Sequence, residues 1–494
     1  MQVTPIGWIL LIVGPLLAIF RPRWLYILTI FSLPFTATDI INVGSGLDVS
    51  GVQAPMYLGC LLLLRHCLVS VKRLSFPLPR KGRICLYWMA IFIAVVAVSL
   101  VMPVWLDGHV EVPSMSLINP TTELIHLKSK NITGVLYMVF GFGFLYLTVA
   151  LNQTIAMSRL TLKTFMAGST FSALWACLEF ACKISGVPYP AMIFNTGTAL
   201  SATGYMERTN FFPRLSSVSV EPSILAQTLL VAISLTLPFV FGGLTLFSKK
   251  RDRSIFVLLL VVLCLTTSST AYIGLLVIAL TVLVLCAVRG VLTPMHLLVP
   301  IAGLSLSALI YATVPVAKQV LDEMFFTKSG SYSALERLMT ITNALQMFRE
   351  HPMLGIGWAS ITSHDLIANI LGNAGILGLL SFTVAMYSIF RALYRSIKSR
   401  SKALRIGGLM RLDFGLYVAL TVTLVTSALS GFLNVFTFFW FVCGFAIVAS
   451  IGIDFFKPRV VPGSAETAVT MSPRSASARD IPVLAFRTQA KTPK

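Results

Sequence analysis

The hydrophobic positions of this chain form continuous runs rather than an alternating pattern. Runs of roughly 17–25 apolar residues recur from one end to the other, and each is long enough to cross a ~30 Å hydrocarbon core as a helix. Continuous runs exclude a transmembrane β-barrel, whose strands alternate apolar and polar positions. The pattern predicts an all-α polytopic membrane protein of about 13 helices. They are expected at about 5–20, 23–38, 52–70, 84–102, 132–151, 160–183, 220–247, 254–269, 271–288, 296–314, 374–393, 412–430 and 434–456.

The eighth and ninth predicted spans are nearly fused. Only the hydroxyl run Thr266-Thr267-Ser268-Ser269-Thr270 separates them. A single long helix at this place would reverse the orientation of every later loop. It would also move the last basic clusters to the outer side, so two helices are the better interpretation.

Composition and charge agree with a membrane protein. Hydrophobic residues make up 56% of the 494 positions and charged residues only 11%. With the N-terminus outside, most of the 38 Lys and Arg residues fall in inner loops, as the positive-inside rule requires. The net charge of +20 is therefore a topology signal, and we expect no nucleic acid as a partner.

These spans predict one transmembrane domain at 1–456 and a disordered basic cytoplasmic tail at 457–494. Large outer loops are expected at about 103–131, 184–219 and 315–373. The sequon at Asn131 is interpreted as a chance match rather than a glycosylation site. All eight cysteines lie in or beside spans, so neither a disulfide nor a metal site is expected.

The loop at 184–219 leads into a membrane helix through an acidic residue. Arg214 comes shortly before Glu221, and Pro222 then opens a long apolar run. An acidic residue followed by proline is an ordinary helix start. A carboxylate at the mouth of a membrane helix is also costly unless it faces water, a partner or a substrate. Both interpretations of Glu221 stay open, with Arg214 as its nearest basic partner.

The loop at 315–373 contains a predicted helix over about 333–349. Ser333 and Glu336 fit a capping box at its start, which favours a capping role for Glu336. An apolar stripe predicts that this helix lies along the membrane surface; it consists of Leu335, Leu338, Ile341, Leu345 and Phe348. Arg337 would then lie near the headgroups, either as an anchor to lipid phosphate or as a ligand of a phosphorylated substrate.

His364 lies in a polar turn before the chain re-enters the membrane. Asp365 follows it directly, and Gly372, Gly375 and Gly378 recur at every third position beyond. Small residues at such spacing allow close helix packing. A lone histidine in a membrane protein often caps or packs, but these polar neighbours favour a functional role for His364.

The chemistry of these residues suits transfer from a diphosphate. Guanidinium groups bind phosphate through two hydrogen bonds and stay charged. A histidine or glutamate of suitable pKa can take a proton from a hydroxyl group. The outer loops contain no aspartate-rich motif for Mg²⁺ and no glycine loop that would cradle a nucleotide. The residues therefore favour transfer of a glycan from a polyprenyl diphosphate carrier, without metal or cofactor.

The chain resembles the O-antigen polymerase and O-antigen ligase superfamily of bacterial inner-membrane glycosyltransferases, by motif over about 210 to 380. The resemblance is carried by Arg337, by His351-Pro352-Met353-Leu354-Gly355-Ile356-Gly357, and by His364 followed by Gly375-Ile376-Leu377-Gly378. The run Thr267-Ser268-Ser269-Thr270 is similar to the family's T-S-R-G turn but lacks its Arg and Gly. Arg214 with Glu221-Pro222-Ser223 is more similar to polymerases than to ligases.

The resemblance implies a GT-C-like architecture and an inverting, metal-independent transfer on the periplasmic face of the inner membrane. The N-terminus would be periplasmic and the C-terminus cytoplasmic. Expected partners are undecaprenyl-diphosphate-linked oligosaccharides, membrane lipid and a polysaccharide chain-length regulator. On this interpretation Arg214 and Arg337 bind the donor diphosphate, and His364 or Glu221 activates the acceptor hydroxyl.

Three functions remain open at this stage. A polymerase of O-antigen, capsule or exopolysaccharide repeat units is favoured. A ligase that transfers glycan to the lipid A core is the second, and a flippase for lipid-linked saccharides is the third. Transporters place ionisable residues near the middle of the membrane, whereas here the deeply placed charges are few and most lie near span ends, which favours chemistry at the surface.

Overall fold

The computed structural model describes residues 2–42, 51–70, 80–113, 121–197, 213–290, 311–322, 332–401, 411–430 and 437–451, with four single residues between 292 and 309. The predicted tail at 457–494 lies outside these residues, and most of the predicted span at 296–314 does too. The domain boundary at 456 stays a prediction.

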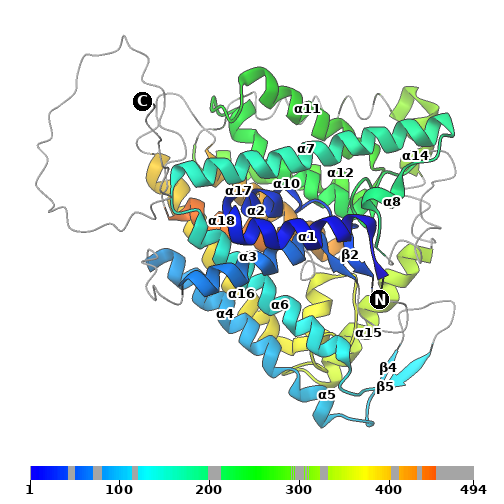
Figure 1. The fold of residues 1–494 in the computed structure, drawn as a ribbon. Coiled ribbons are helices and arrows are strands. Elements are labelled where there is room, and N and C mark those ends of the chain that lie inside the picture. Colours follow the sequence, from blue (N-terminus) through cyan, green and yellow to red (C-terminus); the bar gives the residue numbers. More distant parts are fainter. Residues whose placement is uncertain are drawn as a thin grey trace, which may run out of the picture. The chain divides into compact units, whose positions relative to one another are not determined.

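The described residues are mainly helical (Figure 1). The helices are α1 (Pro5–Phe20), α2 (Pro22–Phe31), α3 (Ala54–Ser70), α4 (Arg80–Val98), α5 (Val101–Trp105), α6 (Ser129–Leu151), α7 (Ile155–Ser185), α8 (Ala191–Phe194), α10 (Pro222–Val240), α11 (Lys249–Leu265), α12 (Ser269–Val288), α14 (Pro315–Asp322), α15 (Tyr332–Glu350), α16 (Leu366–Ser401), α17 (Leu412–Ser430) and α18 (Thr437–Ser450). Short antiparallel strands form two small sheets, β1 (Gln2–Val3) with β2 (Asp39–Asn42) and β3 (Val52–Gln53), and β4 (Glu111–Pro113) with β5 (Thr122–Leu124).

Most predicted spans coincide with a helix. Among the described residues, seven helices are long and apolar enough to cross a membrane, and three shorter apolar helices accompany them. The seven are Arg80–Trp105, Ser129–Leu151, Ile155–Ser185, Pro222–Val240, Ser269–Val288, Leu366–Ser399 and Leu412–Leu429, and the three are Pro5–Phe20, Ala54–Val69 and Thr437–Ser450. The all-α membrane class is confirmed, while the count of thirteen stays a prediction.

Several predicted boundaries are wrong, among them the end of the span expected at 220–247, which stops as a helix at Val240. The span expected at 23–38 ends as a helix at Phe31, because Pro34 cannot donate to the carbonyl of Ile30 and disfavours helix at the residue before it. The span expected at 374–393 begins earlier, at Leu366, and is interrupted at Gly375.

The break between the eighth and ninth predicted spans is confirmed. α11 ends at Leu265 and α12 begins at Ser269. Between them Thr267 has φ 47°, a left-handed conformation that no continuous helix contains. The alternative of one long helix is therefore wrong.

Helices α10 and α18 form the centre of the bundle. Of the apolar stretch of α10, 94% is buried, and every residue of α18 is buried. α10 packs against α17, α11, α12 and α7, while α18 packs against α6, α17 and α16. The outer helices expose large apolar side chains, among them Trp8, Leu136 and Tyr387.

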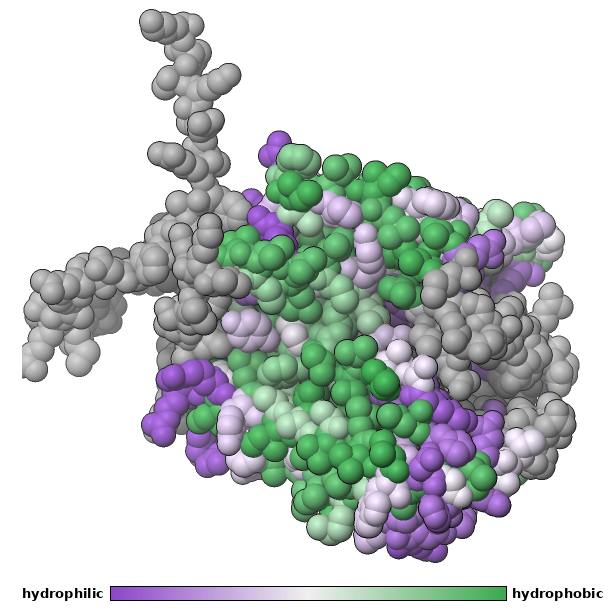
Figure 2. Space-filling model, turned by 60° about the horizontal axis from the view of Figure 1, so that its bottom comes forward, coloured by the Kyte–Doolittle hydropathy of each residue, from purple (hydrophilic) through white to green (hydrophobic). Residues whose placement is uncertain are grey.

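The exposed apolar side chains form a belt. Figure 2 shows apolar residues across the middle of one face, with hydrophilic residues gathered at both ends of it. Hydrocarbon solvates such a belt, whereas water would not. The chain is therefore a multi-pass membrane protein.

The predicted outer loops contribute structure at the same end of the helices. In Figure 1, α8, β2, α14, α15 and the β4–β5 hairpin lie along one side, at the right. β2 pairs with β1 and β3, with Gln2 opposite Asn42, so the N-terminus is fixed to this end.

The turn at 351–357 crosses the break in α16. The N–H of Ile356 donates to the carbonyl of Gly372 at 2.9 Å, and the N–H of Ile376 donates to the carbonyl of Pro352 at 2.8 Å. Gly375 has φ 63° and ψ −162°, which interrupts α16 and frees these backbone groups. Gly375 therefore allows a close approach, as expected of a small residue, and its partner is the turn at 351–357.

Only glycine fits at two places in this crossing. Gly355 also has a positive φ, of 63°. A Cβ atom at Gly355 would overlap the carbonyl oxygen of Gly372, and one at Gly375 would overlap that of Met353. The two backbone segments can approach each other because neither carries a side chain there.

Two further helices hold the same loop. Ser99, at the end of α4, accepts a hydrogen bond from the N–H of Trp358 at 3.0 Å. Asn131, in α6, donates to the carbonyl of Trp358 at 2.8 Å and to Ser360 Oγ at 2.9 Å. Asn131 is 0% exposed. Its side chain therefore serves the fold and cannot accept a glycan.

The crossing predicts a large effect of a single methyl group. Gly375→Ala should lower the free energy of unfolding by about 2 kcal/mol or more, because alanine is strained at this φ and its Cβ meets backbone. The measurement is the apparent melting temperature of the purified protein in detergent. Gly143→Ala in α6 is the control, since the nearest atom to its Cβ is a flexible Leu63 methyl at 3.2 Å. Equal melting temperatures for both variants would contradict this account of Gly375.

Candidate functional site

Glu221 is the residue that starts α10. Its backbone is extended, with φ −141° and ψ 156°, and Pro222 occupies the first helical position. Its carboxylate accepts a hydrogen bond from Ser223 Oγ at 2.9 Å. Within the described part of the chain, the Glu221 side chain caps no amide of α10. The ordinary helix-start interpretation therefore accounts for its place but not for its carboxylate.

Helix α15 is present where the sequence predicts it and carries Arg337. Its inner face packs on a small second core; the buried members are Ile125, Ala344, Met347, Ile356, Ile361 and Ala368. Leu335 and Leu338, at the start of the predicted stripe, are 47% and 62% exposed. Ile341 and Leu345 pack against the second core instead. Part of the stripe therefore binds protein rather than lipid, because the loop after α15 folds back beneath it.

Thr340 links Arg337 to the loop that carries His364. Thr340 Oγ1 donates to the carbonyl of Arg337 at 2.9 Å, one helical turn earlier. The same oxygen lies 3.5 Å from the backbone N–H of His364 and accepts from it. The backbones of Arg337 and His364 are thus tied to one buried hydroxyl group.

Asp365 has a structural role beside His364. Its Oδ1 accepts from the N–H of Ala368 at 2.7 Å, which caps the first turn of α16. Asn373 closes the turn from the other side, donating to the carbonyl of Ile361 at 2.8 Å. His364 therefore precedes a rigid helix start, and its side chain is half-buried.

Electrostatics brings three of the four predicted site residues together. Burial lowers the pKa of His364, the positive charge of Arg337 lowers it further, and the negative charge of Glu221 opposes the change. Burial raises the pKa of Glu336, which Arg337 opposes and Glu221 reinforces. Glu221, Arg337 and His364 therefore form one charged group with Glu336, to which α10, α15 and the turn before α16 contribute.

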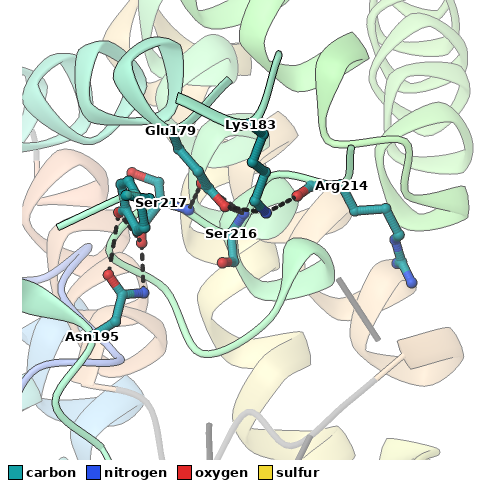
Figure 3. A network of polar contacts seen from close by, with 7 residues as sticks. Glu179, Lys183, Asn195, Arg214, Ser216 and Ser217 are labelled. Carbon is teal, nitrogen blue, oxygen red and sulfur yellow. Dashed lines mark hydrogen bonds and ion pairs between the residues drawn. The ribbon is translucent and has the colours of Figure 1, made fainter. Parts of the chain in front are cut away.

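Arg214, the fourth predicted residue, is fixed through its backbone. Its carbonyl oxygen accepts a hydrogen bond from Lys183 Nζ at 2.7 Å. Figure 3 shows the Arg214 guanidinium pointing away from Lys183 and Glu179. Arg214 lies in the segment that runs into α10 and ends at Glu221.

Sequence reasoning missed two parts of this site. The first is Glu336, which the sequence assigned to helix capping although its carboxyl interacts with Glu221 and Arg337. The signal is its spacing of four residues from Thr340, which places Glu336 and Thr340 on the same face of α15. The second part is the pair Glu179 and Lys183. Two opposite charges four residues apart within an apolar run predict an ion pair on one face of a membrane helix.

Comparison with known proteins identifies part of the chain. A comparison of the sequence with curated proteins returned no match. Residues 254–383 match the family model described as O-antigen ligase, from α11 through α15 and into α16. The match includes Glu336, Arg337 and His364, while Arg214 and Glu221 precede it. Together with the motifs at 351–357 and 375–378, this match supports the resemblance to the O-antigen polymerase and O-antigen ligase superfamily.

Proposed function

We propose that this protein polymerises lipid-linked polysaccharide repeat units on the periplasmic face of the bacterial inner membrane. It would transfer a glycan from undecaprenyl diphosphate to a hydroxyl group of another saccharide. The match of residues 254–383 to the family model described as O-antigen ligase supports a glycosyltransferase-like enzyme of polysaccharide assembly. The observation that carries the proposal is the charged group of Glu221, Arg337 and His364, contributed by the start of α10, by α15 and by the turn before α16.

The electrostatics of this group suit the two halves of the transfer. The guanidinium group of Arg337 can bind a diphosphate through two parallel hydrogen bonds. The lowered pKa of His364 keeps its imidazole neutral, so that it can accept a proton. A cation for the leaving group and a base for the acceptor are what glycan transfer from a diphosphate needs.

In the proposed step, the acceptor hydroxyl oxygen forms a bond to the anomeric carbon of the donor sugar. His364 takes the hydroxyl proton as this bond forms. The bond between the anomeric carbon and the diphosphate oxygen breaks, and its electron pair leaves with the diphosphate. Arg337 and Arg214 stabilise the growing negative charge. Attack opposite the leaving group inverts the anomeric configuration, and Glu221 is the competing candidate for the base.

A ligase is the second candidate, because the matched family model is described as O-antigen ligase. A ligase would use the same donor chemistry but would transfer a finished glycan to a different acceptor. Arg214 and Glu221 lie outside the matched residues, so the match does not bear on them.

Deletion of the gene should distinguish the two enzymes. Loss of a polymerase should leave single repeat units, on the carrier or at the cell surface. Loss of a ligase should leave long chains on the carrier. The measurement is the size of the lipid-linked and surface glycans, and an unchanged pattern in both pools would contradict both functions.

Substitution of Arg337 should lower the rate of transfer. Arg337→Ala should raise the barrier by about 2–4 kcal/mol, by analogy with the loss of one oxyanion donor. Arg337→Lys should restore little activity if the arginine makes two hydrogen bonds to the diphosphate. The measurement is the rate of glycan extension by purified protein in lipid nanodiscs. Arg349→Ala, at the exposed end of the same helix, is the control and should retain activity. Full activity of Arg337→Ala would contradict a role of Arg337 in binding the diphosphate and would favour its interpretation as an anchor to lipid phosphate.

The pH profile should distinguish His364 from Glu221 as the base. Burial and Arg337 lower the pKa of His364. We therefore expect kcat/KM to fall only when the pH drops below about 6.5, the ordinary pKa of histidine. Glu221 raises this pKa, so Glu221→Gln should move the acid limb to lower pH. If Glu221 is the base, Glu221→Gln should abolish activity instead. Glu350→Gln, at the exposed end of α15, should leave the limb in place.

A further inference from the structure

Helix α7 contains a charged pair that the proposed mechanism does not use. Glu179 and Lys183 lie one helical turn apart, and Lys183 Nζ is 2.7 Å from Glu179 Oε1. The Glu179 side chain is 2% exposed and that of Lys183 is 15% exposed. Removing two charges from water costs more than their attraction returns unless other hydrogen bonds complete the pair. A buried pair in a membrane helix therefore calls for a role.

Both members of the pair bind the backbone of one segment, 214–217. Glu179 Oε2 accepts from the N–H of Ser217 at 2.6 Å and from that of Ser216 at 3.1 Å. Lys183 Nζ donates to the carbonyl of Arg214 at 2.7 Å. Figure 3 shows these contacts on one side of the segment, with the Arg214 side chain directed away from the pair.

The segment holds a conformation that needs such support. Ser217 has φ 53°, a left-handed conformation that costs energy for a residue with a Cβ. Its carbonyl accepts from Asn195 Nδ2 at 2.7 Å and from Tyr189 Oη at 3.2 Å. Its hydroxyl donates to the carbonyl of Ser172 in α7 at 2.6 Å. Contacts from three parts of the chain thus fix one strained residue.

Hydrogen bonds also fix the backbone between Ser217 and Glu221. The carbonyl of Val218 accepts from the N–H of Ala37 at 3.0 Å, and the N–H of Val220 donates to Thr36 Oγ1 at 3.3 Å. The next residue is Glu221, where α10 begins. A rigid backbone therefore runs from Arg214 to Glu221, fixed at its start by the ion pair.

We propose that Glu179 and Lys183 are positioning residues, which set the backbone from which Arg214 reaches the donor diphosphate. The inference rests on the proposed function, because it gives Arg214 a diphosphate to bind. Preorganised cations stabilise developing charge without reorganising during the reaction. The pair supplies this preorganisation through the Arg214 carbonyl and the Ser216 and Ser217 amides. Neither residue touches the substrate.

The first experiment changes the pair while keeping its shape. Lys183→Met removes the ammonium group, and the double variant Glu179→Gln with Lys183→Met removes both charges, which avoids a lone buried carboxylate. Lys183→Arg keeps a donor to both partners. In nanodiscs, with undecaprenyl-diphosphate-linked repeat units as donor, both charge-removing variants should raise the donor KM about tenfold. Lys183→Arg should stay within about threefold of the parent protein.

The second experiment asks whether the pair acts through Arg214. In an Arg214→Ala background, the double variant should cause no further rise in donor KM, because its target side chain is gone. A merely structural role would lower activity equally in both backgrounds. Thr161→Val is the matched control in α7. It removes a buried hydroxyl that donates to Asn152 at 2.6 Å at the far end of the helix, and it should lower the melting temperature with donor KM unchanged.

The outcomes separate this inference from the proposed function. Unchanged donor KM in the double variant, or equal effects with and without Arg214, overturns the positioning role while leaving the transfer reaction in place. Full activity of Arg337→Ala and His364→Ala overturns the proposed function instead. Binding of undecaprenyl diphosphate alone, measured by the shift in melting temperature, gives a readout without turnover. The double variant should weaken this binding about tenfold, and parent-like binding would contradict the positioning role.

Discussion

Two backbone hydrogen bonds hold the turn at 351–357 against the interruption of α16, and the candidate site depends on this contact. Ile356 donates to Gly372, and Ile376 donates to Pro352. A broken helix leaves backbone donors and acceptors without partners, which hydrocarbon does not tolerate. The turn supplies those partners, so the break can exist at the membrane end of the bundle. His364 lies in the chain between the two halves of this contact, and its place follows from it.

The remaining charged groups reach His364 through rigid elements. α15 brings Arg337 and Glu336, and Thr340 binds the same helix to the backbone of His364. α10 brings Glu221 from the centre of the bundle, where burial of almost the whole helix fixes its N-terminus. The group is therefore supported by packed helices rather than by loops alone, which is the arrangement that preorganised catalysis requires.

The sequence predicts the helices well because each needs only a local apolar run. α1 and α17 match their predicted bounds, and the break at Thr267 follows from its hydroxyl neighbours. The sequence does not predict contacts between distant segments. The pairing of β1 with β2, the partner of Gly375 and the backbone held by Glu179 all depend on residues far apart in the chain. For the same reason Glu336 looked like a cap, since the sequence does not show that Glu221, at the start of α10, comes close enough to raise its pKa.

The paired glycines also limit how such a site can diversify. Gly355 and Gly375 each face a carbonyl oxygen of the opposite segment, so a side chain at either position moves both segments. Because the overlapped atoms belong to the backbone, no exchange of a neighbouring side chain would remove the overlap. The turn and the interrupted helix on either side of His364 are therefore constrained together. Strand β5 at the same end is exposed along its whole length, so side chains can change there without meeting this contact.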